Sequence, residues 1–128
     1  MTETTGVNKL VRDHAVGVHW MRVENTATPG TPDLNGCHCG REAWIESKLI
    51  RTGNKIHFQP TQAPWIIHRT ACGSRVFILV RRGDELRLWS GGEIGELLTR
   101  GWLAGGAIWQ SPVRGADWEQ FKKVVFGV

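Results

Sequence analysis

Apolar residues recur every three or four positions near the start of the chain. These are Val7, Leu10, Val11 and Ala15, with Gly17 directly after them. Such spacing places the apolar side chains on one face of a helix, and a glycine commonly ends one. We therefore expect a helix over residues 4–16. A strand should follow over 18–23, where β-branched and aromatic residues gather.

Residues 42–50 show the most regular alternation in the chain. Alternate side chains of a strand point to opposite faces. One set looks like a core face: Ala43, Ile45, Ser47 and Leu49. The other set is Trp44, Glu46 and Lys48, so a carboxylate and an ammonium should lie side by side. Before this strand we expect a loop over 26–31, a short extended piece at 32–34 and a turn at 36–40.

The rest of the chain alternates between the two kinds of element. Thr61 is a plausible cap for a helix through Gly73, with Pro64 tolerable only in its first turn. Further elements are expected as strands at 75–80 and 85–89 and helices near 93–100 and 117–124. This order predicts one α/β domain over residues 1–128, built around a mixed sheet. Its core should span about 4–90, and 91–128 should form an extension.

The composition is that of an ordinary soluble domain, with 41% apolar and 22% charged residues among 128. No apolar run reaches the roughly 20 residues of a membrane-spanning helix, and the start lacks the features of a secretory signal. We therefore expect a cytoplasmic protein. The formal net charge of +4 is compatible with a polyanionic partner such as DNA. On charge alone, a mildly basic protein with no such partner is equally compatible.

Three cysteines leave a zinc site open as an alternative. Cys37 and Cys39 flank His38, while His68 and Cys72 come later in the chain. Structural zinc pairs usually have two to four residues between the cysteines, so a single one is too close. Reduced cysteines are the favoured interpretation. Loops typical of nucleotide binding and the serine motif of esterases are absent from the sequence, so no nucleotide cofactor is expected.

The chemistry-bearing residues are Asp33, Glu46 and Lys48. A hairpin between the extended piece and the following strand would bring Asp33 close to Glu46. Two carboxylates at one site attract a hard divalent cation such as Mg²⁺, and the Lys48 amine beside them could serve a water molecule or a phosphate. The alternative without a function is that Asp33 is an ordinary loop residue and that Glu46 forms an exposed ion pair with nearby cations, which contributes little to stability. The hypothesis requires that all three groups converge and stay within reach of solvent.

These residues resemble the signature of the PD-(D/E)XK nuclease superfamily. Pro32-Asp33 is followed by twelve positions and then Glu46-Ser47-Lys48. Residues 30–34 resemble the G-x-P-D-L box of the VRR-NUC branch and of related phage and archaeal Holliday-junction resolvases. The resemblance implies a restriction-endonuclease-like core, α-β-β-β-α-β, with helices flanking a central mixed sheet. The likeness to phage-borne members also suggests a viral or mobile-element origin.

The resemblance also implies residue roles. Asp33, Glu46 and the backbone carbonyl of Ser47 would hold Mg²⁺, for which Mn²⁺ could substitute, and Lys48 would serve the water or the phosphate. Gln62 resembles a glutamine that many of these nucleases place beside the site. Related resolvases carry a further metal-site glutamate in the first helix, which residues 4–16 lack. Glu3 could fill that role, with Asp13 and Glu24 as weaker stand-ins, or Glu3 could merely favour a helix N-terminus. The number of metal ions therefore stays open.

The function expected from these features is that of a metal-dependent endodeoxyribonuclease, selective for branched DNA and working as a homodimer. Other nuclease activities on the same core (nickase, flap endonuclease or exonuclease) and a non-catalytic DNA-binding module stay open. Candidate DNA contacts are Lys55, His57, Arg51 and Lys9. The pair Arg81-Arg82 is either a DNA contact or a solvated turn. Aromatic residues of the extension are candidates for a dimer contact: Trp109, Trp118, Phe121 and Phe126.

Overall fold

The computed structural model describes residues 3–24 and 28–128, with side chains from residue 6 onward. The helices are α1 (Glu3–His14), α2 (Gln62–Ala71), α3 (Ile94–Arg100) and α4 (Trp118–Phe126). The strands are β1 (His19–Arg22), β2 (Leu34–His38), β3 (Arg41–Ile50), β4 (Val76–Arg82), β5 (Glu85–Ser90) and β6 (Trp109–Pro112). Two single 3₁₀ turns, η1 (Gly91–Glu93) and η2 (Gly101–Leu103), flank α3.

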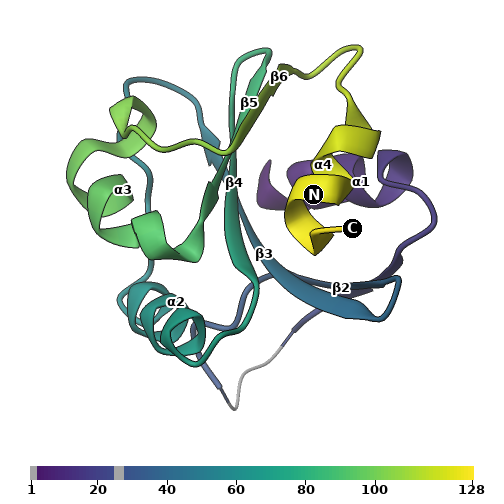
Figure 1. Cartoon of the computed structure of the whole chain (residues 1–128). Coiled ribbons are helices and arrows are strands. Elements are labelled where there is room, and N and C mark those ends of the chain that lie inside the picture. Colours follow the sequence, from purple (N-terminus) through teal and green to yellow (C-terminus); the bar gives the residue numbers. More distant parts are fainter. Residues whose placement is uncertain (1–2, 25–27) are drawn as a thin grey trace.

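The strands form one six-stranded sheet in the order β1-β2-β3-β4-β5-β6. β3 and β4 are parallel and joined through α2, while every other neighbouring pair is antiparallel. Helices α1 and α4 cover one face of the sheet and α2 and α3 the other (Figure 1). This is the mixed sheet flanked by helices that the sequence predicts.

Each face of the sheet carries its own apolar core. On β4, Phe77 and Leu79 belong to the core under α1 and α4, whereas Ile78 and Val80 belong to the core under α2 and α3. A strand buried on both faces is expected to read as a continuous apolar run, as β4 does. β3 lies beside it, so its functional side chains have to emerge from a sheet that is covered on both faces.

The turn expected at residues 36–40 is shorter than predicted, because β2 runs on through Gly36 to His38. Only Cys39 and Gly40 form the turn, and both have positive φ angles, 51° and 76°, as two-residue hairpin turns require. Gly36 is part of strand β2. The position requires glycine because a Cβ there would come within 2.5 Å of the Trp20 ring on β1. The glycine that suggested a turn instead makes room for an aromatic ring.

The helix expected after Thr61 is confirmed, but the predicted capping role of Thr61 is wrong. Thr61 has helical backbone angles and its side chain makes no cap hydrogen bond. Instead, the Gln62 side-chain oxygen accepts a hydrogen bond from the Gln59 N–H at 2.8 Å. Pro64 lies in the first turn of α2, where its missing N–H costs nothing.

The segment after residue 90 is part of the domain core. β6, which the sequence did not predict, pairs with β5, and α4 seals the face shared with α1. Trp109, Phe121 and Phe126 are buried, and Trp118 packs against the first two of them. The expectation that Trp109, Phe121 and Phe126 supply a dimer contact is therefore wrong, because these rings are buried inside the chain. Trp118 is half-buried, and its part in a dimer contact stays a prediction. In the part of the chain that the structure describes, no helix has the length and apolarity to cross a bilayer.

Candidate active site

Asp33 lies one residue before β2, where the pairing with β3 ends. The final pair of that ladder is Leu34 and Ile45, so the same register continued by one residue sets Asp33 opposite Glu46. The Asp33 carbonyl accepts a hydrogen bond from the Val23 N–H at 2.8 Å, which turns its backbone toward β1. Antiparallel neighbours that exchange no backbone hydrogen bonds lie closest, with Cα atoms about 4.5 Å apart. The two carboxyl groups are close enough to interact, since Asp33 raises the pKa of Glu46.

Gln62, at the start of α2, connects Glu46 to Lys48. Its side-chain nitrogen donates to Glu46 Oε1 at 3.3 Å, and its oxygen accepts from Lys48 Nζ at 2.7 Å. The same oxygen accepts from the Gln59 N–H, so the orientation of the amide is determined by three partners. Lys48 Nζ also lies 4.0 Å from Glu46 Oε2. The structure thus brings together Asp33, Glu46, Lys48 and Gln62, as the sequence predicted.

Glu46 departs from the expectation of solvent access, because only 1% of its surface is exposed. The pKa of its carboxyl is raised to about 9, mainly by burial and further by the neighbouring Asp33 carboxyl, with Lys48 opposing the rise. Asp33 is only half-buried, so solvent reaches the pair from its side. Glu46 therefore keeps its proton near neutral pH in the metal-free site.

Burial also lowers the pKa of the Lys48 amine, against the opposing negative charges of Glu46 and Asp33. Only 11% of the Lys48 side chain is exposed, and its Nζ lies 4.8 Å from the centre of the Phe58 ring. A lysine held in this way gives up its proton more readily than one in water. The site therefore pairs an acid that holds its proton with an amine that can release one.

A close backbone contact joins the loop that carries Asp33 to the start of α2. Gly30 has a φ of 93°, and a Cβ there would lie 2.2 Å from the carbonyl oxygen of Thr61. Only glycine fits both the angle and the space. The glycine of the G-x-P-D-L box thereby places Asp33 at a constant distance from the helix that carries Gln62.

Gly30→Ala should therefore lower the free energy of unfolding by about 1–3 kcal/mol and reduce any activity of the site. Urea denaturation of Gly40→Ala provides the control, since Gly40 also has positive φ but its added Cβ meets nothing within 4 Å. Equal losses in the two variants would mean that only backbone strain is involved and that the contact with Thr61 contributes nothing.

The β3–α2 loop, residues 51–61, closes the site on one side. Ile56 is buried and Phe58 half-buried in the core under α2 and α3, while Lys55 and His57 alternate with them and are exposed. Sequence analysis identified both exposed residues but missed Phe58. The alternation of apolar and polar residues from 55 to 59 is the signal that could have revealed it.

The remaining predicted residues lie farther out or outside the description. Glu3 is the first residue of α1, and its side chain lies outside the described part. Asp13 and Glu24, the weaker candidates for the same metal-ligand role, each form an exposed ion pair, Asp13 with Lys9 and Glu24 with Arg22. Both carboxylates therefore interact with a cationic side chain on the surface. Arg51 is exposed just beyond β3.

The cysteines do not form a metal site with the described residues. Cys37, Cys39 and Cys72 are free thiols and exposed. Among the side chains of residues 6–24 and 28–128, no three His, Cys, Asp or Glu gather in a way that could hold a metal ion. A metal at Asp33 and Glu46 would need further ligands such as a backbone carbonyl and water.

The sheet, its helices and the position of the carboxyl pair define a restriction-endonuclease-like fold, which confirms the predicted fold class. Among solved structures, the chain is similar to Hjc, a Holliday junction resolvase from the archaeal hyperthermophile Archaeoglobus fulgidus. The TM-score is 0.54 and the identity 14%, over 72% of this chain and 78% of that one. No protein-family model and no curated protein sequence matches the chain. Membership of the VRR-NUC branch stays a prediction.

Proposed function

We propose that this protein is a metal-dependent endodeoxyribonuclease that hydrolyses phosphodiester bonds at Asp33, Glu46 and Lys48. The observation that carries the proposal is the meeting of two carboxyls from neighbouring strands with an amine two residues along β3. Phosphodiester hydrolysis needs a cation to neutralise developing charge, a positioned water and a group that takes its proton. The fold shared with a resolvase supports the same proposal.

The donor set fits Mg²⁺, with Mn²⁺ as a substitute, because Mg²⁺ prefers carboxylate and carbonyl oxygens and keeps several waters. Asp33 and Glu46 would hold it together with the backbone carbonyl of Ser47. The Trp44 N–H donates a hydrogen bond to the Arg75 carbonyl, on the side of β3 that faces β4. Because backbone groups alternate along a strand, the Ser47 carbonyl points to the other side, beyond the end of the β2 ladder. A bound ion would supply Lewis-acid activation of the phosphate and of a water molecule.

The chain's own residues have distinct tasks in this proposal. Lys48 Nζ, whose pKa is lowered by burial, accepts a proton from the attacking water or holds a phosphate oxygen. Gln62 orients Lys48 through the 2.7 Å hydrogen bond and keeps it next to Glu46. Phe58 covers the amine and limits its access to bulk water. Lys55 and His57, exposed on the β3–α2 loop beside these groups, are placed to contact DNA phosphates.

We further propose that the substrate is branched DNA and that the chain works as a symmetric homodimer. In residues 3–24 and 28–128, the helices and strands all belong to the sheet and the layers that flank it, whereas sequence-specific enzymes usually read base edges in the major groove with additional elements. Paired cuts in a four-way junction need two active sites, and a two-fold dimer provides them. The similarity to a Holliday junction resolvase supports this choice among nuclease activities.

The burial of Glu46 favours one rival, a DNA-binding module without catalysis. A protonated Glu46 beside Asp33 could serve as a structural pair. The two functions differ in their response to metal: a nuclease site binds Mg²⁺ and cuts, whereas a structural pair does neither.

Labelled four-way junction, flap, plasmid and linear duplex DNA should be incubated with the full chain in Mg²⁺, in Mn²⁺ and in EDTA. We expect paired cuts in the junction in either metal, little cleavage of linear duplex, and none in EDTA. Equal cutting of all substrates would retain the nuclease and reject the selectivity for branches. Binding without any cleavage in either metal would leave the DNA-binding module.

A further inference from the structure

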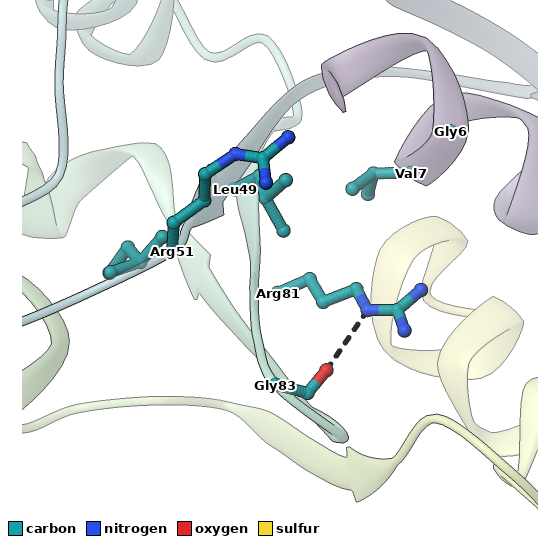
Figure 2. A pocket seen from close by; sticks show the side chains of 7 residues that line it. Gly6, Val7, Leu49, Arg51, Arg81 and Gly83 are labelled. Carbon is teal, nitrogen blue, oxygen red and sulfur yellow. Dashed lines mark hydrogen bonds between the residues drawn. The ribbon is translucent and has the colours of Figure 1, made fainter. Parts of the chain in front are cut away.

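A cavity of about 400 Å³ lies between α1 and the ends of β3 and β4. It is formed by Gly6 and Val7 of α1, by Leu49 and Arg51 at the end of β3, and by Arg81 and Gly83 at the end of β4 (Figure 2). It is separate from the carboxyl pair: Leu49 points to the α1 face of the sheet, whereas Glu46 and Lys48 point to the α2 face. Two of the described residues that line it are arginines, and none is acidic.

Arg81 has an unusual place on β4. It follows Phe77 and Leu79 on the face that forms the core under α1, and its partners in the ladder are Leu49 and the buried Leu86. The side chain is half-buried, and its Nε donates to the Gly83 carbonyl at 3.0 Å. In the described part of the chain, Arg81 forms no ion pair. Its guanidinium is thus held in place beside the cavity, with no acidic partner among the described side chains.

The first turns of α1 form another wall of this cavity. Gly6 is the fourth residue of the helix and lies in its first turn. The N-terminal end of a helix carries a partial positive charge that favours anions. A Cβ at Gly6 would meet nothing within 4 Å. Arg81 on β4 and the N-terminal end of α1 therefore border the same open space.

We propose that this cavity binds a backbone phosphate of the DNA substrate, held by Arg81. The inference rests on the proposed function in that it takes DNA as the ligand. An arginine fork pairs with phosphate through two parallel hydrogen bonds. The cavity lies at the same end of β3 as Lys48, and the three residues from Lys48 to Arg51 span about 10 Å. Because the cavity and Lys48 lie on opposite faces of the sheet, the DNA would pass around this end of β3 to contact both.

Gly6→Glu and Gly6→Gln provide the matched test, because both replace a helical glycine and are expected to stabilise α1. The glutamate adds a negative charge at the cavity, and the glutamine adds nearly the same volume without one. Binding of a fluorescent four-way junction to the full chain is measured by anisotropy in EDTA, over a series of salt concentrations. We expect Gly6→Glu to bind about tenfold more weakly than Gly6→Gln at low salt.

Arg81→Gln should also bind about tenfold more weakly than the wild type, and its slope of log affinity against log salt should fall by about 0.9. Arg41→Gln is the control, since Arg41 is an exposed arginine at the opposite end of β3. If Arg81→Gln fails to fold, Arg81→Lys, which keeps the charge but loses the fork, should retain the salt slope and bind more weakly.

The outcomes separate this inference from the proposed nuclease activity, because binding is measured without metal and cleavage by the wild type is scored separately in Mg²⁺. If the wild type cleaves DNA but Gly6→Glu binds like Gly6→Gln and Arg81→Gln like Arg41→Gln, the phosphate site is rejected and the nuclease stands. If the affinities fall as expected while the wild type cuts nothing, the phosphate site stands and the nuclease is rejected. Absence of DNA binding by the wild type would overturn the inference as well.

Discussion

Lys48→Met should lower the cleavage rate by a factor on the order of 10³ and leave both DNA and Mg²⁺ binding close to the wild-type level. The methionine keeps the aliphatic length beneath Phe58, so packing is largely preserved, but the amine that serves the water or phosphate is gone. Single-turnover cleavage of a labelled junction measures the loss, and anisotropy in EDTA measures binding. Lys123→Met, on the exposed side of α4, is the control for removing one positive charge.

Asp33→Asn should lose cleavage to a similar extent, but it should also lose Mg²⁺ affinity, since one of the two carboxylates is gone. The two variants thus distinguish the roles of their residues. Asp84→Asn, in the exposed turn between β4 and β5, is the matched control. Unchanged cleavage by either Lys48→Met or Asp33→Asn would refute the assignment of the active site.

The second large effect concerns Glu46, whose pKa of about 9 in the folded protein lies far above its ordinary value of 4.5. Between these two values the folded chain holds a proton that the unfolded chain releases. The contribution of the Glu46 carboxyl to the free energy of unfolding is therefore fully present below pH 4.5 and is lost as the pH rises toward 9. The slope is about 1.4 kcal/mol per pH unit. Urea denaturation in EDTA should show this decline in the wild type and not in Glu46→Gln.

Mg²⁺ binding should release the proton that Glu46 holds in the folded protein. Mg²⁺ needs the ionised carboxylate, so binding at Glu46 releases a proton, and the apparent affinity should rise by up to about tenfold per pH unit below the folded pKa. Calorimetric titrations between about pH 6 and pH 8 measure both the affinity and the proton release. Glu96→Gln, an exposed substitution on α3, should behave like the wild type. A Mg²⁺ affinity independent of pH would mean that Glu46 is no ligand.

The candidate site was largely predictable from the sequence because its parts are close together along the chain. Strand alternation places Glu46 and Lys48 on one face, and a hairpin is enough to bring Asp33 to them. The predicted turn is too long because glycine is typical of turns and Gly36 was included in it. Glycine is required there because the Trp20 ring, on another strand, leaves no space for a side chain. β6 and the interior location of Trp109 were missed for the same reason, since both depend on β5 and α4.

The sequence by itself determined which side chains share a face of β3, because the alternation of a strand is a local property of the backbone. Only the tertiary structure decided that Asp33 continues the ladder opposite Glu46 and that α2 brings Gln62 and a covering apolar layer to them. It also decided that Arg81 borders a cavity with α1. Burial, and with it the raised pKa of Glu46, arises from segments distant in sequence packing on both faces of one sheet, and no local pattern encodes that packing.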